Sequence, residues 1–264
     1  MDRTDFLFGE LKSRFGTVKR ARGNFLYTAS GVRLTDLYRE GGRAVLGWPS
    51  QESAVTVFKN VLSRGITGSY ITDFTYALDK AVSMLFNSSR RCIAFSFKED
   101  ACAFAEEKFS DSFVWFRPWN TDVSVAEKSC ILFEPVFPWA ENTVLACIDS
   151  DWKGFEGAVT ERSVQLSAPL CAAVTRSVYN LIKALQVYEE KNWFLYDTVL
   201  NPYFTRKGPW LYSKIPEDSY DEFVLHCLDC HIVVSPDPDV PSAVPFGVQK
   251  GVFDLLKKNP FGGR

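Results

Sequence analysis

Apolar residues recur every three or four positions in five segments of the chain, which is the spacing that buries one side of an α-helix. In the longest of these segments, Leu170, Val174, Val178, Leu181 and Leu185 fall on one stripe. The pattern predicts helices over Asp5–Phe15, Gln51–Ser63, Thr75–Phe86, Glu99–Lys108 and Ala168–Glu190.

The middle of the chain has a different pattern of short apolar runs bounded by polar residues. Runs of this kind are typical of strands buried on both faces of a sheet. They predict strands over Cys92–Phe95, Phe113–Phe116, Cys130–Phe133 and Val144–Ile148. A helix between the first two strands indicates an α/β fold with a central, mostly parallel sheet.

The two ends of the chain predict smaller elements. Asn24–Tyr27 and Val32–Leu37 are extended runs that flank Ala29–Gly31, which favours a hairpin. Near the other end, a small α+β lobe is predicted from Tyr212–Ile215, Glu217–Leu228, Ile232–Val234 and Gly251–Lys258. We therefore expect a segment 1–50 that packs with the C-terminal lobe, a major domain over 51–200 and a small domain over 201–264.

Composition narrows the class of protein. The 264 residues carry a formal net charge of −2 and include seven cysteines. The near-neutral charge lacks the basic footprint of a nucleic-acid-binding protein, and no apolar run has the length of a membrane-spanning helix. Without a secretory signal pattern, the cysteines are expected to be reduced thiols, and the expected location is the cytoplasm.

Several short motifs occur in a fixed order along the chain. The first group is residues 24–27, 31–37 and 46–47, and the later motifs are 95–99, 130–135, 167–173 and the tail 215–260. Their order resembles that of class III aminotransferases, which are fold-type I enzymes that use pyridoxal phosphate. Residues 24–47 are similar to the opening strands of that family, with Trp48 where the family usually has histidine. The resemblance implies a reduced major domain of the pyridoxal-phosphate transferase type and a small lobe built from both chain ends.

The resemblance also shows what the chain lacks. The cofactor needs a lysine for its Schiff base and an acid partner for its ring nitrogen. In the family both lie between the strand that ends in Glu-Pro and the helix that starts near Asn-Pro-Leu. Here only 32 residues separate Pro135 from Ala168, and the interval contains one lysine, Lys153, at a spacing that does not match the family.

The phosphate-binding turn is altered as well. Ser96 and Glu99 match the family pattern, but Phe97 replaces the glycine that lets a phosphate approach the helix N-terminus, and we expect its side chain to obstruct that approach. Lys98 could contact a phosphate, although a solvated lysine at a helix start is the simpler interpretation. Ser96, Lys98 and Glu99 are therefore the vestigial cofactor-binding candidates.

A cluster of cysteine and histidine lies at 226–231. Its sequence contains Cys-x-x-Cys-His, the attachment pattern of c-type haem, and its two cysteines and two histidines could suggest zinc. Four ligands within about one and a half helical turns are too crowded for one tetrahedral ion, so no metal is expected. We expect Cys227 and Cys230 to pack at the end of a helix, with a redox-active thiol pair as the alternative.

The leading hypothesis is a degenerate, non-catalytic relative of class III aminotransferases that acts as a binding or regulatory protein and needs no cofactor. One alternative is an active transaminase that holds pyridoxal phosphate on Lys153. Another is a subunit that completes a site with a longer aminotransferase-like partner. The resemblance implies a homodimer, and neither nucleic acid nor a membrane is expected as a partner.

Overall fold

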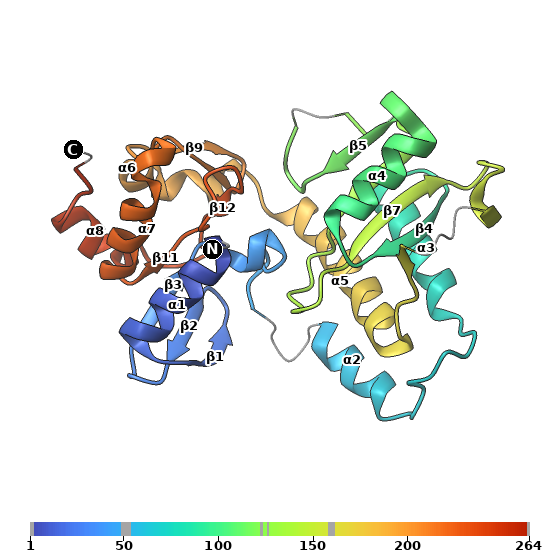
Figure 1. The fold of residues 1–264 in the computed structure, drawn as a ribbon, viewed down its shortest axis with the longest axis horizontal. Coiled ribbons are helices and arrows are strands. Elements are labelled where there is room, and N and C mark those ends of the chain that lie inside the picture. The colour runs from blue at the N-terminus through green and yellow to red at the C-terminus, as the bar shows by residue number, and fades with distance from the viewer. Residues whose placement is uncertain (1–2, 49–53, 122–123, 126, 158–161, 263–264) are drawn as a thin grey trace. The chain divides into compact units, whose positions relative to one another are not determined.

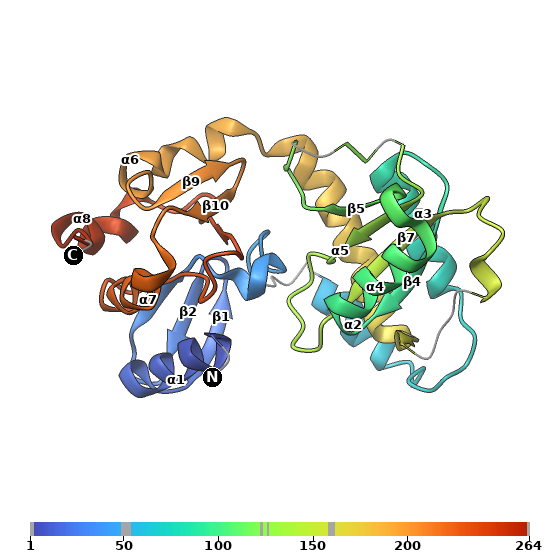
Figure 2. The same ribbon diagram turned by 45° about the horizontal axis from the view of Figure 1, so that its top comes forward.

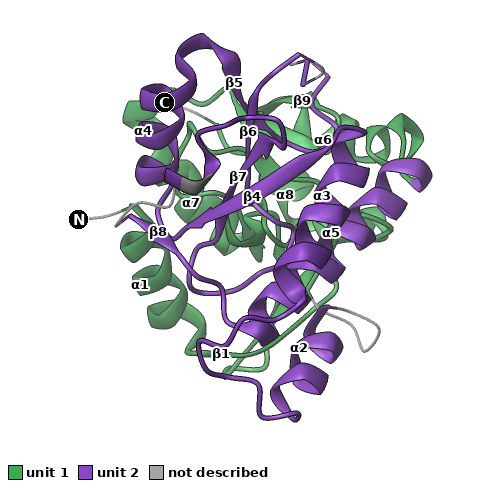
Figure 3. Ribbon diagram, turned by 90° about the vertical axis from the view of Figure 1, so that its right-hand side faces the viewer, with its two compact units in different colours: residues 1–50, 188–264 green, residues 51–187 purple. Residues whose placement is uncertain are grey.

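The computed structural model describes residues 3–48, 54–121, 124–125, 127–157 and 162–262. The chain divides into two compact units, one made of residues 1–50 with 188–264 and the other of residues 51–187 (Figure 3). Residues 188–200, which the sequence analysis assigned to the larger domain, belong to the unit that contains both chain ends. Each unit is described separately below.

The unit formed by residues 51–187 is built on a five-stranded sheet with the strand order β5-β6-β7-β4-β8 (Figures 1 and 2). Its strands are β4 (Arg90–Phe95), β5 (Phe113–Phe116), β6 (Cys130–Phe133), β7 (Val144–Asp149) and β8 (Ser163–Val164). Its helices are α2 (Ala54–Leu62), α3 (Phe74–Phe86), α4 (Lys98–Phe109) and α5 (Ala168–Val187).

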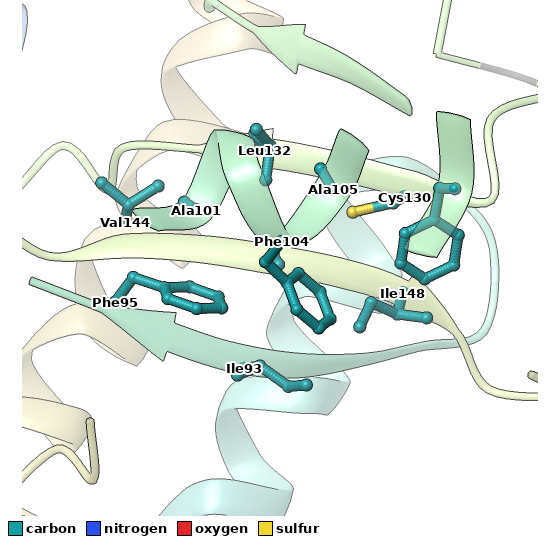
Figure 4. Close-up of a cluster of buried hydrophobic side chains, with 11 residues drawn as sticks. Ile93, Phe95, Ala101, Phe104, Ala105, Cys130, Leu132, Val144 and Ile148 are labelled. Carbon is teal, nitrogen blue, oxygen red and sulfur yellow. The ribbon is translucent and has the colours of Figure 1, made fainter. Parts of the chain in front are cut away.

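Helix α4 covers one face of this sheet (Figure 4). Alternate residues of β4, β6 and β7 point toward the helix because successive side chains of a strand face opposite sides. Phe104 of α4 lies among them and is only 4% exposed. The other members of this core are Ile93, Phe95, Ala101, Ala105, Phe109, Cys130, Leu132, Val144, Ala146 and Ile148.

The intervening strand residues face the other side of the sheet, where α3 packs against β4 and α5 packs against α3. Helix α5 begins directly after Ser167 and carries Pro169 in its first turn, a position where proline is tolerated because that N–H has no helical partner. Helix α3 ends at Asn87, which adopts the left-handed conformation that commonly closes helices.

The sheet is mixed, which corrects the expectation that it is mostly parallel. Only β5 and β6 form a parallel pair, whereas β7 is antiparallel to both β6 and β4, and β8 is antiparallel to β4. The reason is the length of the connection between β6 and β7. Residues 134–143 are too few for the crossover of a dozen or more residues that a parallel return needs. The helix α4 does connect two strands of the same direction, β4 and β5, but β7 and β6 lie between them.

The second unit contains a four-stranded sheet, β1-β2-β3-β11, and a three-stranded sheet, β12-β10-β9. Its strands are β1 (Val18–Arg22), β2 (Phe25–Thr28), β3 (Arg33–Asp36), β9 (Phe204–Lys207), β10 (Trp210–Ser213), β11 (Ile232–Val233) and β12 (Ser242–Ala243). Its helices are α1 (Arg3–Phe15), α6 (Asp197–Leu200), α7 (Tyr220–Asp229) and α8 (Asp254–Lys258).

Pairing between distant segments holds this unit together. Strand β3, from the start of the chain, pairs in parallel with β11, near its end. Helices α1 and α7 are joined by ion pairs from Arg3 to Asp221 at 3.5 Å and from Arg14 to Asp229. The hairpin predicted at the start of the chain is confirmed as β2 and β3.

Within the described residues, no helix is long and apolar enough to cross a membrane.

Candidate functional site

The carboxyl end of β4 is where the sequence predicted a vestigial phosphate-binding turn. Ser96 follows the strand and is half-buried, and Phe97 is the residue that immediately precedes α4. The Phe97 side chain is 61% exposed, so it points away from the core and toward solvent. The backbone of the turn has the extended conformation usual for a residue before a helix, and Phe97 supplies no side-chain cap.

The first turn of α4 carries two carboxylates. Glu99 matches the family pattern, whereas Asp100 adds a second negative charge where the helix dipole attracts anions. The ammonium group of Lys98 lies 4.5 Å from the centre of the Trp115 ring, which places it on an aromatic face. The three vestigial candidates Ser96, Lys98 and Glu99 are thus adjacent in space but do not form a phosphate cup.

Lys153 lies at the opposite end of β4 from Ser96. It follows β7, whose last residue, Asp149, pairs with Arg90 at the start of β4. At roughly 3.3 Å per residue, the six steps from Arg90 to Ser96 span about 20 Å. Lys153 is exposed, and the ring of its neighbour Trp152 packs 4.9 Å from that of Phe109, at the far end of α4.

The residues present therefore do not fit a pyridoxal phosphate site. A lysine must reach the aldehyde carbon of the same molecule whose phosphate is held at the helix N-terminus. The candidate lysine and the candidate phosphate turn lie at opposite ends of one strand. The structure does not bring Lys153 together with Ser96, Lys98 and Glu99.

Trp48, which stands where the family usually has histidine, has a structural role in the unit formed by the two chain ends. The indole Nε1 of Trp48 donates a 2.8 Å hydrogen bond to Oδ2 of Asp36, and the backbone N–H of Arg39 donates one of 3.0 Å to Oδ1. Burial raises the pKa of Asp36, against the lowering influence of the Arg39 charge. Burial lowers the pKa of Arg39 to about 10.

A cavity of about 460 Å³ lies along the free edge of β4, beside the short strand β8. Because β8 pairs only with Ala94 and Phe95, the outer edge of the earlier β4 residues is left to other partners. There the carboxylate Oδ1 of Asp79, on α3, accepts a 2.8 Å hydrogen bond from the backbone N–H of Cys92. Burial raises the pKa of Asp79, and burial raises that of Cys171, which also lines the cavity, to about 12.

The cysteine and histidine side chains at 226–231 contact other residues of the unit formed by the chain ends. Cys227 and Cys230 are each 2% exposed at the end of α7, which confirms the packing role. The imidazole Nε2 of His226 lies 2.8 Å from the carbonyl oxygen of Asn259, and the His231 ring packs edge-on against Phe15. Among the described residues, no group of three or more histidine, cysteine or acidic side chains could hold a metal ion.

Sequence reasoning did not identify Asp79, nor the partners of Cys92 and Cys147. Both cysteines lie within runs that were correctly predicted as strands. The pairing of β4 with β7 places the two cysteines opposite each other. This pairing depends on strand order, which hydrophobic periodicity does not encode. The signal available in the sequence was that each of these two runs contains a cysteine, Cys92 in one and Cys147 in the other.

Comparison with solved structures identifies the fold. The chain superposes on an ornithine aminotransferase from Plasmodium yoelii with a TM-score of 0.64 and 10% identity, covering 98% of this chain and 97% of that chain. For an acetylornithine aminotransferase from Elizabethkingia anophelis, the TM-score is 0.62, the identity 10% and the coverage 95% and 96%. For an omega-transaminase from Sphaerobacter thermophilus, the values are 0.63, 11%, 97% and 96%. The fold is that of class III aminotransferases, as the sequence motifs predicted.

Two sequence relatives match most of the chain. A protein of Treponema pallidum (strain Nichols) is 24% identical over 290 residues, covering 89% of this chain and 91% of its own length. A protein of Borreliella burgdorferi is 24% identical over 249 residues, covering 91% and 88%. Both are described only as uncharacterized proteins. No protein-family model matches the chain.

Proposed function

We propose that this chain is a non-catalytic protein with the aminotransferase fold, which acts by binding or regulation and not by Schiff-base chemistry. The observation that carries the proposal is the separation of Lys153 from Ser96 by the length of β4, about 20 Å. No rotation of a lysine side chain spans that distance. Asp100, beside the Glu99 that matches the family pattern, adds a second negative charge at this turn.

The proposal is tested with purified protein and an equimolar amount of pyridoxal phosphate. We expect no new visible absorbance band beyond that of the free cofactor, and no lysine labelled after borohydride reduction and peptide mapping. An active class III aminotransferase from which the cofactor was removed serves as the positive control. Stoichiometric labelling of one lysine would overturn the proposal.

Two lysine variants sharpen the test. If the alternative of an active enzyme holds, Lys153→Ala abolishes both the band and turnover, whereas Lys98→Ala weakens cofactor binding through the phosphate. Under our proposal neither variant changes the absorbance spectrum of the mixture. Co-purification of a longer aminotransferase-like chain, with a band that appears only in the mixture of both chains, would instead support a site completed by a partner.

We also propose that the chain forms a homodimer, in keeping with the family that it resembles. Light scattering coupled to size-exclusion chromatography measures this directly. Twice the mass of one chain is the expected result, and a single-chain mass that persists at the highest attainable concentration would contradict it.

A further inference from the structure

Two cysteines face each other across the central sheet of the unit formed by residues 51–187. Cys92 of β4 and Cys147 of β7 are register partners in an antiparallel pair. The backbone N–H of Cys92 donates to Asp79 Oδ1, at the opposite edge of the strand, and not to β7. In an antiparallel ladder this makes Cys92 and Cys147 a non-hydrogen-bonded pair, the type in which opposite Cα atoms lie closest, at about 4.5 Å.

The two side chains lie on the same face. Their strand neighbours Ile93 and Ile148 lie in the core beneath α4 (Figure 4), and Ala146 belongs to the same core. Cys92 and Cys147 therefore point toward the opposite face, where α3 packs. The neighbouring Cys147 thiol, together with burial, raises the pKa of Cys92. A disulfide requires Cα atoms roughly 4.4–6.8 Å apart with converging Cβ atoms, and the Cα separation typical of a non-hydrogen-bonded pair falls within that range.

The two thiols differ in access. Cys92 is half-buried and lines the cavity of about 460 Å³ at the free edge of β4. Cys147 is 0% exposed, between β4 and β6. Of the two, Cys92 is the one that lines the cavity, so we assign it as the thiol that a small reagent reaches first.

We propose that Cys92 and Cys147 form a reversible disulfide by exchange with a small-molecule disulfide, with Cys92 as the attacking thiol and Cys147 as the resolving thiol. The Cys92 thiolate attacks one sulfur of the reagent, which forms a mixed disulfide and releases the other half as a thiolate. That thiolate takes the proton of Cys147, whose sulfur then attacks Cys92 and releases the second half of the reagent. Two protein thiols lose two electrons, and the reagent disulfide gains them as two thiols.

The chemistry of the site sets the rate. Exchange proceeds through the thiolate, so a cysteine whose pKa is raised reacts slowly at neutral pH. In this regime the rate rises about tenfold per pH unit, because the thiolate fraction does. The product joins β4 to β7 covalently and removes the free thiol beside Asp79 from the cavity wall.

The test uses the reduced, folded full-length chain incubated with oxidised glutathione at mildly alkaline pH. Free thiols are then blocked under denaturing conditions, and the digest is mapped without reduction. We expect a linked pair of peptides containing Cys92 and Cys147, a loss of two hydrogens from the intact mass, and full reversal by a reducing agent. Linkage of Cys92 to another cysteine, or modification that stops at the mixed disulfide in the wild-type chain, would overturn the proposal.

Matched variants separate the roles. Cys147→Ser should accumulate the glutathione adduct on Cys92, whereas Cys92→Ser should abolish the linkage and leave Cys147 unmodified. Cys171→Ser, which changes another thiol of the same cavity, and Cys130→Ser, which changes a thiol on the opposite face of the sheet, should leave the linkage intact. If Cys171→Ser abolishes the linkage while its far-ultraviolet circular dichroism matches that of the wild type, Cys171 is the partner and the proposal is wrong.

Discussion

Trp48 and Asp36 are joined by a 2.8 Å hydrogen bond from the indole Nε1 to the carboxylate Oδ2 inside the unit formed by the two chain ends. The carboxylate is 1% exposed, and its other oxygen accepts the backbone N–H of Arg39. Arg39 is 0% exposed, with a guanidinium that donates to the carbonyl oxygen of Gly23 at 3.2 Å. Trp48, which stands where the family usually has histidine, thus donates a hydrogen bond to the second oxygen of the buried Asp36 carboxylate.

Replacing Trp48 with phenylalanine should destabilise the chain by about 1–3 kcal/mol. The aromatic bulk is largely kept, but one oxygen of a buried carboxylate loses its donor, and an unsatisfied buried acceptor carries a penalty of this size. Urea unfolding followed by circular dichroism measures the change. Trp139→Phe is the matched control, because its indole bonds to Glu141 at the surface. It should change the unfolding free energy by less than about 0.5 kcal/mol.

Asp36 should also make stability depend on pH in a defined direction. Burial raises its folded-state pKa above 3.8, so the folded chain holds the proton more tightly than the unfolded chain. The stabilisation from that proton is complete below the unfolded pKa and is lost as the pH rises through the folded pKa. The unfolding free energy of the wild type relative to Asp36→Asn should therefore fall as the pH rises from the unfolded-state pKa of Asp36 through its folded-state pKa. A relative stability that rises with pH there would contradict the assignment.

Two phenylalanines near the same helix test the core assignment. Phe104 of α4 is 4% exposed between Phe95 and Phe109, whereas Phe97, just before the helix, is 61% exposed. Phe104→Ala should reduce the unfolding free energy by about 3–5 kcal/mol, because it leaves a cavity in the core. Phe97→Ala should stay within about 0.5 kcal/mol. A large effect of Phe97→Ala would show that this side chain is covered in the protein in solution.

Much of the fold could be predicted from the sequence because its long elements have clear periodicity. The strand runs at Phe113–Phe116 and Cys130–Phe133 have the predicted bounds, and helix α5 differs from its prediction only at the end. The two-residue strands β8, β11 and β12 are too short for periodicity to define. Of these, only β11 falls within a predicted run, Ile232–Val234.

The site was harder to predict, because strand order and direction decide which residues meet. The sequence named Lys153 and Ser96 as candidates for one cofactor. Their separation follows from the antiparallel register of β4 and β7, in which Arg90 pairs with Asp149. No local pattern in either strand states that register. The same register is what places Cys92 opposite Cys147, although the two residues are 55 positions apart in the chain.

Arg90 should be among the most sensitive charged positions of the unit formed by residues 51–187. It is 4% exposed and donates from Nε to Ser88 at 2.8 Å and from Nη1 to the carbonyl oxygen of Cys147 at 3.2 Å, and its Nη2 pairs with Asp149 at 3.2 Å. Arg90→Met should cost about 2–3 kcal/mol of unfolding free energy, because buried acceptors lose a charged donor.

The adjacent Arg91→Met is the matched control for this change. The Arg91 guanidinium is exposed and lies over the Phe155 ring, 3.6 Å from its centre, so its loss should cost about 0.5–1 kcal/mol. Because Asp149 keeps a side chain that is 43% exposed, water can replace its lost partner, and the cost of Arg90→Met should therefore not depend strongly on pH near neutrality. Equal effects of the two substitutions would mean that Arg90 is solvated and does not join β4 to β7.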